Sequence, residues 1–191
     1  MRVNEIFYSL QGEGAHTGTA AVFVRFSGCN LACPFCDTNH LPYDDMTEEE
    51  IAAEVCSYPA NWVILTGGEP TLQNTDLLLS LLHEAGKKVA IETNGTRAIL
   101  LEYDWVTVSP KVAFAKPHTV NQKWANEVKL IFDDKHEPDD CGIEAENYYL
   151  QPCDTGNKEE NAVIVQHCIE YIKAHPKWKL SLQIQKILNV R

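Results

Sequence analysis

The sequence predicts an α/β protein with the architecture of a partial, open (βα)6-type barrel. Short apolar, β-branched segments alternate with helical ones, and this alternation favours parallel strands joined by right-handed crossovers. Polar motifs that contain glycine or proline follow successive strands, which is where a βα barrel assembles a site on its top face. Because six strands cannot close as eight do, we expect the barrel to remain open.

The strand segments share a short length and a high content of β-branched or aromatic residues. Six of them belong to the predicted barrel, and a seventh follows near the C-terminus. In chain order they are Ala21–Phe26, Trp62–Thr66, Lys88–Glu92, Trp105–Ser109, Glu127–Phe132, Tyr148–Gln151 and Lys179–Ile184.

Three helices are predicted between these strands. Thr47 and Glu50 have the spacing of a capping box, which begins the first helix. Gly86 closes the leucine-rich second helix, and Pro176 cannot continue the third. The predicted helices are Thr47–Tyr58, a segment around Leu77–Leu82, and Glu160–His175, whereas Phe114–Asn126 and Asp133–Glu146 are predicted as loops.

The length and composition are those of one domain. A chain of 191 residues, with 45% hydrophobic and 23% charged residues, can bury its own core. We expect residues 1–191 to form this domain, with residues 1–20 and the C-terminal strand around the barrel rim. The net charge of −11 argues against nucleic acid as a partner, and no apolar stretch approaches a membrane span. These features predict a cytoplasmic protein, in which clustered thiols indicate a metal site or catalysis rather than disulfides.

Three cysteines lie close together after the first barrel strand, in the segment SGCNLACPFCDT. Cys29, Cys33 and Cys36 have the spacing C-x3-C-x2-C, which suits an iron–sulfur cluster or a zinc site. A structural zinc ion would need a fourth ligand, and His40 could supply it. A [4Fe–4S] cluster could instead leave one iron free for a small molecule. The spacing alone leaves both possibilities open.

The cysteine pattern, with the aromatic Phe35 directly before the last cysteine, resembles the radical S-adenosylmethionine (SAM) superfamily. In that superfamily three cysteines bind a [4Fe–4S] cluster, and the amino acid part of SAM chelates the fourth iron. The segment GGEP follows the next strand, where the superfamily places a backbone segment that binds the SAM amino group. Across the chain, the resemblance narrows to the 7-carboxy-7-deazaguanine synthase family. The matching motifs are FYSLQGEG (7–14), FVRFSGCNLACPFCDT (23–38), LTGGEP (65–70), ETNG (92–95), SPK (109–111), QPCD (151–154) and the terminal SLQIQKILNVR.

This resemblance implies a radical SAM lyase that acts on a carbon–nitrogen bond. In the family, SAM bound to the cluster is cleaved reductively to a 5′-deoxyadenosyl radical, which takes a hydrogen atom from 6-carboxy-5,6,7,8-tetrahydropterin. The ring then contracts with loss of ammonia and gives 7-carboxy-7-deazaguanine, in 7-deazapurine and queuosine biosynthesis. The resemblance also implies Mg²⁺, a homodimer and an electron donor such as flavodoxin.

The resemblance also assigns residues to the cofactors and the substrate. Contacts to SAM are expected from Phe35, Cys36, Asp37, Gly68, Ser109, Pro110, Lys111, Gln151, Pro152, Cys153 and Asp154. Contacts to the pterin are expected from Leu10, Gln11, Gly12, Arg25, Thr66 and the terminal carboxylate of Arg191, with Glu13 beside them. Cys29, Cys33 and Cys36 should hold the cluster, and Thr38 should ligate Mg²⁺ together with substrate oxygens and water.

Two of these assignments have a structural alternative. Arg25 lies within an apolar strand, where an unpaired charge is costly, so it needs a partner. The resemblance implies the substrate carboxylate, whereas a salt bridge within the protein is the alternative. Thr38 follows a turn, so it could be an ordinary helix cap instead of a metal ligand.

The chain departs from the family pattern near its C-terminus. The family usually carries a histidine two residues after the glutamine that matches Gln183, but this chain has Gln185 there. Glutamine can donate a hydrogen bond but cannot titrate, which leaves a titrating role at this position in doubt. The remaining cysteines, Cys56, Cys141, Cys153 and Cys168, are predicted to be small buried hydrophobic residues.

Two other functions are compatible with the cysteine spacing. A different radical SAM enzyme, such as an activase of a glycyl-radical protein, would need a protein partner and no Mg²⁺ at Thr38. A zinc-stabilised or ferredoxin-like electron-transfer module would not need GGEP, SPK and QPCD at successive strand ends.

Overall fold

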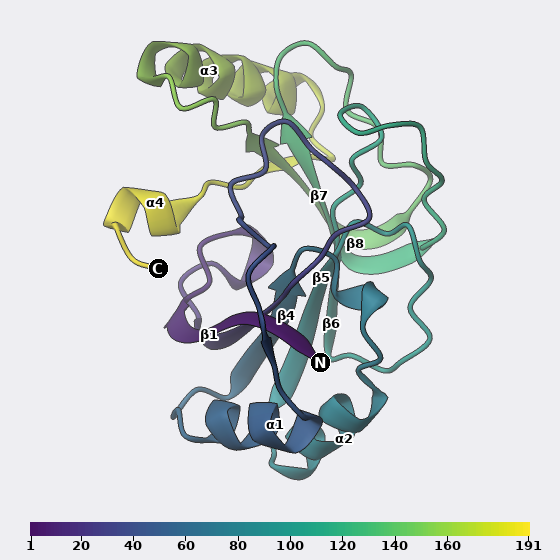
Figure 1. Cartoon of the computed structure of the whole chain (residues 1–191). Coiled ribbons are helices and arrows are strands. Elements are labelled where there is room, and N and C mark those ends of the chain that lie inside the picture. The colour runs from purple at the N-terminus through teal and green to yellow at the C-terminus, as the bar shows by residue number, and fades with distance from the viewer.

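A single twisted sheet forms the centre of the computed structural model, which describes residues 1–191 (Figure 1). Its nine strands lie in the order β3-β1-β2-β4-β5-β6-β7-β8-β9. The six barrel strands are mutually parallel and follow one another in the sheet as they do in the chain. This arrangement confirms the predicted open barrel. The six are β2 (Ala20–Phe26), β4 (Trp62–Gly67), β5 (Lys88–Thr93), β6 (Trp105–Val108), β7 (Trp124–Phe132) and β8 (Glu144–Pro152).

Two barrel strands begin earlier than the sequence predicts. Trp124 and Ala125, assigned to a loop, belong to β7, and Glu144 to β8. These residues pair with one another across the two strands, Trp124 with Glu144 and Ala125 with Ala145. The prediction was wrong here because local composition does not reveal such a pairing.

Strand β1 (Arg2–Leu10) was not predicted as a strand. It pairs antiparallel with β2 from Val3 opposite Phe26 to Leu10 opposite Ala20, and the short β3 (Asp44–Asp45) pairs with its outer edge. The N-terminal segment therefore extends the sheet instead of only bordering the barrel.

The predicted C-terminal strand is largely wrong. Only β9 (Lys179–Leu180) joins the sheet, parallel to β8, and the chain then turns into the short helix α4 (Ile184–Leu188). The alternation in SLQIQ is typical of a strand, but Gln183 and Gln185 both donate hydrogen bonds to Glu13. These bonds direct the segment across the mouth of the barrel, and away from the sheet edge.

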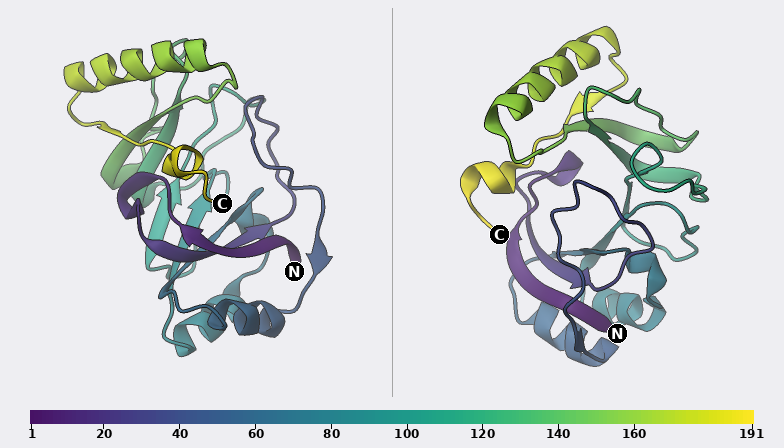
Figure 2. Two further views of the ribbon diagram at one scale, coloured as in Figure 1. Left: turned by 90° about the vertical axis from the view of Figure 1, so that its left-hand side faces the viewer. Right: turned by 45° about the horizontal axis from the view of Figure 1, so that its top comes forward.

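The three predicted helices are present. Helix α1 (Glu48–Cys56) has the predicted capping box. Thr47 Oγ1 accepts from the Glu50 backbone amide at 3.2 Å, and Glu50 Oε2 accepts from the Thr47 backbone amide at 2.8 Å. Helix α2 (Asp76–Glu84) is followed by Gly86 at a φ of +75°, and α3 (Lys158–Ala174) is capped by the Asn157 side chain, which accepts from the Glu159 and Glu160 amides. Figure 2 shows α1 and α2 at one end of the molecule and α3 at the other. Single 3-10 turns occur at Gly14–His16 (η1) and Pro70–Leu72 (η2).

The hydrophobic core is divided along the sheet. One cluster of 13 buried residues packs β1, β2 and β4 against α1 and α2, and another cluster of 13 packs β6, β7 and β8 against α3. The crossovers from β5 to β6, β6 to β7 and β7 to β8 contain no α-helix. None of the helices combines the length and apolar character that a membrane-spanning segment requires.

Candidate functional site

One cavity of about 310 Å³ lies at the carboxyl ends of the barrel strands. The ends of all six barrel strands line it, together with the cysteine loop, the loop after β1 and the C-terminal segment. Every residue that the sequence predicts for cofactor, substrate or metal lines this cavity, except Pro110, which is buried. The volume and the mixed polar lining suit a small-molecule site.

The cysteine loop contributes the three thiols of Cys29, Cys33 and Cys36. All three are free and line the cavity, and Cys36 is exposed. Burial raises the pKa of the Cys29 and Cys33 thiols. No group of three or more His, Cys, Asp or Glu side chains converges as the ligands of one ion would. Three cysteine thiolates on one loop are the ligand type that holds a [4Fe–4S] cluster, so Cys29, Cys33 and Cys36 would be its ligands.

His40, the possible fourth ligand of a zinc ion, is not part of the cavity. Its side chain does not line the cavity, and its Nδ1 atom is buried without a hydrogen-bond partner. Its backbone carbonyl accepts from the Gly28 amide at 3.0 Å and from Ser27 Oγ at 2.6 Å, which closes the loop at its base. His40 therefore has a structural role here, and the zinc alternative loses its fourth ligand.

The GGEP motif braces the start of the cysteine loop. A Cβ atom on Gly68 would lie 1.9 Å from the Gly28 carbonyl oxygen, so only glycine allows this close approach. The Glu69 amide donates to the same carbonyl at 2.9 Å. The buried Glu69 carboxylate accepts from the Asn94 amide at 2.7 Å, and Asn94 Nδ2 donates to Asn30 Oδ1 at 3.0 Å. The segments that follow β4 and β5 thus hold Asn30, the residue next to Cys29, in place.

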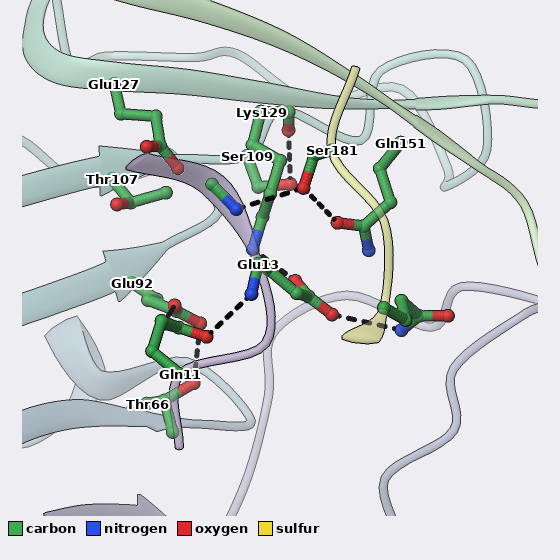
Figure 3. A network of polar contacts seen from close by, with 12 residues as sticks. Gln11, Glu13, Thr66, Glu92, Thr107, Ser109, Glu127, Lys129, Gln151 and Ser181 are labelled. Atoms are coloured by element: carbon green, nitrogen blue, oxygen red, sulfur yellow. Dashed lines mark hydrogen bonds and ion pairs between the residues drawn. The ribbon is translucent and has the colours of Figure 1, made fainter. Parts of the chain in front are cut away.

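A buried ion pair between Glu13 and Lys129 organises the opposite side of the cavity (Figure 3). Lys129 is only 6% exposed and contacts Glu13 Oε2. Gln183 and Gln185 donate to Glu13 Oε1 at 3.0 and 3.1 Å. Burial alone would raise the pKa of Glu13, but Lys129 and the two amides outweigh it and lower the pKa to about 2. Glu13 is therefore a fixed anion, not a base poised to accept a proton.

Further carboxylates surround the same lysine. Glu92 accepts from Gln11 Nε2 at 2.8 Å and from Thr66 Oγ1 at 3.3 Å, so it orients two residues predicted to contact the pterin. Glu127 accepts from the Ala15 amide at 2.7 Å, and burial raises its pKa. Burial would lower the pKa of Lys129, but the three carboxylates outweigh it and raise that pKa well above its ordinary value.

Arg25 has a partner within the protein, as its place in an apolar strand required. Its Nε atom donates to Glu5 Oε1 at 2.8 Å, and its Nη1 atom lies 3.5 Å from Thr38 Oγ1. Arg191 pairs with the other oxygen of Glu5, and Ser9 Oγ donates to the Arg191 carbonyl oxygen at 2.5 Å. The salt-bridge alternative is thus realised, while Arg25 and Arg191 still line the cavity.

Lysines complete the cofactor side. Lys186 bridges Asp37, at 3.2 Å, and Asp154, at 2.8 Å, and so ties α4 to the CDT and QPCD motifs. Hydrogen bonds, chiefly from Lys186, lower the pKa of Asp154 to about 2. Lys111 donates to the Ser109 carbonyl at 2.8 Å, and burial lowers its pKa to about 8. Lys111 has no carboxylate partner, so it can accept an anionic group of a bound cofactor.

The remaining cysteines only partly fit the prediction. Cys153 and Cys168 are buried, as expected. Cys56 is exposed on the last turn of α1, and Cys141 is half-buried in a turn, so the prediction was wrong for both. Cys56 lies on the solvent face of α1, whereas Ile51 and Val55 are the residues that this helix buries.

Comparisons with known proteins decide between the functions that the cysteine spacing left open. The profile of the Radical SAM superfamily matches residues 23–127. The 7-carboxy-7-deazaguanine synthase of Bacteroides thetaiotaomicron is 50% identical over 190 residues, which cover 100% of this chain and 98% of that protein. The chain belongs to the 7-carboxy-7-deazaguanine synthase family. The enzyme of this name from Haemophilus influenzae is 38% identical over 97% of this chain and 92% of its own.

Membership of the family agrees with the fold. The crystal structure of QueE from Escherichia coli superimposes with a TM-score of 0.75 at 27% identity, covering 95% of this chain and 93% of that one. The chain is therefore a radical SAM enzyme of the lyase class, and the superfamily implies a [4Fe–4S] cluster and SAM.

The sequence analysis did not assign several polar residues of the cavity to the site, among them Glu92, Lys129, Gln183 and Lys186. A usable signal existed for two of them. Lys129 lies in the apolar strand NEVKLIF, where the reasoning applied to Arg25 also requires a partner, and Glu92 begins the matched motif ETNG.

Proposed function

We propose that this chain converts 6-carboxy-5,6,7,8-tetrahydropterin to 7-carboxy-7-deazaguanine with loss of ammonia. One observation carries the proposal: the thiols of the cysteine triad open into the same cavity as Gln11, Arg25 and Glu92. A radical SAM reaction needs the cluster and a substrate pocket side by side, because the radical must meet one substrate hydrogen before it meets water.

The cofactor side has the groups that a cluster and SAM require. Cys29, Cys33 and Cys36 would hold the cluster, and Lys111 would meet an anionic group of the cofactor. When bound, the cluster and SAM supply hydrogen-atom abstraction by a 5′-deoxyadenosyl radical. The protein orients both partners and excludes water.

The substrate side offers complementary polar groups. Gln11, whose amide is oriented by Glu92, would bind the pterin ring through its hydrogen-bonding edge. Arg25 uses Nε for Glu5 and Nη1 for Thr38, so its Nη2 atom remains available for the substrate carboxylate. The position of Arg191, fixed by Glu5 and Ser9, supports the proposed contact of the chain end with the pterin.

We also propose a Mg²⁺ ion at Thr38. Thr38 Oγ1 lies 3.5 Å from Asp37 Oδ1, and both residues line the cavity. Mg²⁺ keeps several waters and takes few protein ligands, so one or two oxygens are enough when substrate oxygens complete its shell. The ion would act as a Lewis acid and a template as the ring reorganises.

Thr38 variants test the metal proposal. Thr38→Ala removes the ligand oxygen, so it should keep the brown cluster and SAM binding but lose the Mg²⁺ stimulation of turnover. Thr38→Ser keeps the hydroxyl and should keep most of the stimulation. Turnover of the wild type and both variants is compared with and without Mg²⁺. Thr38 begins no helix, so the helix-cap alternative is wrong. Stimulation of Thr38→Ala as strong as that of the wild type would mean that Thr38 does not ligate the metal.

The partners are part of the proposal. We propose that the enzyme works as a homodimer in the cytoplasm, takes electrons from a donor such as flavodoxin, and supplies queuosine or another 7-deazapurine pathway. Full-length similarity to named 7-carboxy-7-deazaguanine synthases supports the pathway, while the homodimer, the location and the donor rest on the resemblance to the family.

Anaerobic reconstitution tests the reaction directly. The reconstituted protein is mixed with SAM, a reductant, Mg²⁺ and 6-carboxytetrahydropterin, and the products are identified by mass spectrometry. We expect 7-carboxy-7-deazaguanine and ammonia. Cleavage of SAM without any change to the pterin would instead indicate a radical SAM enzyme with another substrate.

A further inference from the structure

Ser181 lies between β9 and α4, behind the wall of the cavity. It is 3% exposed and does not line the cavity, so it does not contact a ligand there. Its amide donates to the Leu150 carbonyl at 2.9 Å, which holds it beside β8. Any part that Ser181 plays in the reaction must therefore act through its neighbours.

The Ser181 hydroxyl connects two motifs that are far apart in the sequence (Figure 3). Its Oγ atom accepts from the Gly14 amide at 3.0 Å and donates to Gln151 Oε1 at 3.0 Å. The partner atoms fix the direction of both bonds, because the Gly14 N–H can only donate and the amide oxygen of Gln151 can only accept. The hydroxyl hydrogen is therefore donated to Gln151 Oε1.

The Gly14 end of this link belongs to the substrate side. Gly14 has a φ of +64°, and a Cβ atom there would lie 2.1 Å from Glu127 Oε1, so the turn is tightly packed. The same turn carries Gln11 and Glu13, which line the cavity. A shift of the Gly14 amide therefore moves the residues proposed to meet the pterin.

The Gln151 end belongs to the cofactor side. Gln151 is 3% exposed, lines the cavity and begins the QPCD motif. Because Ser181 binds the amide oxygen, Gln151 Nε2 has no partner within the chain and remains as a donor toward the cavity. Without Ser181 the amide is free to rotate by half a turn and present its oxygen instead.

We infer that Ser181 is a positioning residue that couples the cofactor and substrate halves of the site. Contact of the pterin with the Gly14 turn would hold the backbone amide on the Ser181 hydroxyl, and the hydroxyl holds the Gln151 amide on the cofactor side. The two ligands consequently bind with positive cooperativity, and the coupling is reciprocal. This inference rests on the proposed function for the identity of the substrate.

Equilibrium binding measures this coupling without turnover. The dissociation constant of SAM is measured by equilibrium dialysis, with and without 6-carboxytetrahydropterin, on reconstituted enzyme without reductant. In the wild type the pterin should tighten SAM binding about five-fold or more. In Ser181→Ala the factor should fall below about two-fold, while each ligand alone still binds.

Matched variants separate coupling from a general loss of structure. Ser181→Cys keeps the side-chain size with a much weaker hydrogen bond, so it should also lose most of the coupling. Thr75→Ala removes another buried hydroxyl, bonded to Tyr103 and outside the cavity, and should keep the wild-type factor.

Three results would overturn the inference. They are an unchanged factor in both Ser181 variants, an equal loss in Thr75→Ala, and independent binding of the two ligands in the wild type. Failure of the wild type to bind the pterin at all is a separate result, which would remove the proposed substrate and this inference with it.

Discussion

The two sides of the cavity are built in different ways. The cysteine loop, residues 27–43, contains no helix or strand, and Cys36 is exposed. The opposite side holds a Glu13 carboxylate bonded to three donors and a Lys129 side chain that is 6% exposed. The cysteine side is therefore an irregular loop with an exposed thiol, whereas internal hydrogen bonds and an ion pair hold the pterin side in place.

The difference indicates which interactions order each side of the cavity. A preformed metal site rarely exists in an unfolded chain, so the binding of a cluster contributes free energy to the ordering of the loop that carries its ligands. Hydrogen bonds and a buried charge pair order the pterin side in advance, which lowers the entropy cost of substrate binding. The predictions below separate these two sources, from the largest expected effect to the smallest.

Removal of one cysteine of the triad should abolish cluster binding and SAM cleavage and leave the stability of the fold unchanged. Cys29→Ala, Cys33→Ala and Cys36→Ala should each end SAM cleavage and lower the iron content after reconstitution. The melting temperature of the cluster-free protein should stay the same, because these thiols are not part of the core. Cys56→Ala and Cys168→Ala are the controls and should keep their iron. A triad variant with a full cluster and normal turnover would refute the assignment.

Loss of Lys129 should damage the preformed side. Lys129→Met leaves Glu13 as a buried charge without its cation, so the free energy of unfolding should fall by about 3–5 kcal/mol. Urea denaturation measures the loss. The double variant Lys129→Met/Glu13→Gln removes both charges and should recover much of it. If the single and double variants are equally unstable, the lysine stabilises the fold through packing instead of the ion pair.

An Arg25 variant tests the proposed contact between this arginine and the substrate carboxylate. Arg25→Ala should weaken binding of the carboxypterin by about 2–5 kcal/mol, the usual penalty for the loss of one partner of a buried charge pair. SAM binding should change much less. Glu5→Gln is the comparison, since it removes the charge that Arg25 and Arg191 share but keeps both arginines. Equal losses for both ligands, or an unfolded variant, would mean that Arg25 serves the internal salt bridge.

Acid should weaken the preformed side gradually. The pKa of Glu13 is about 2 in the folded chain and 4.5 as an ordinary carboxyl, so it stabilises the fold above pH 4.5. That contribution is lost as the pH falls from 4.5 toward 2, with about 1 kcal/mol gone by pH 4. Urea titrations of cluster-free wild type and Glu13→Gln measure it. A variant whose stability falls as steeply as that of the wild type would exclude Glu13 as the titrating group.

The sequence predicted the open side well because its signals are local. Cys29, Cys33 and Cys36 lie within eight residues, and the other motifs stand where strands end. Parallel strands bring such ends together without further information. The cysteine spacing together with the motifs at the strand ends was enough to indicate the family, and the comparisons confirm that family.

The preformed side could not be predicted in the same way, because its partners are distant in the chain. Glu13 and Lys129 are 116 residues apart, and Gln183 lies 170 residues from Glu13. Only the completed sheet brings them together. The same reason explains why the predicted strand Lys179–Ile184 is wrong beyond Leu180: Gln183 bonds to Glu13, a residue near the other end of the chain.

The two large clusters of the core, which a third cluster of five buried residues accompanies, have a consequence for how the molecule opens. Val89 belongs to the cluster on the side of α1 and α2, and Ile91, two residues later on β5, belongs to the cluster on the side of α3. Cooperative units of this kind can open separately, and amide hydrogen exchange reports each opening. We expect two groups of slowly exchanging amides that meet at β5. Because the cavity draws its residues from both groups, the opening of either unit dismantles the whole site.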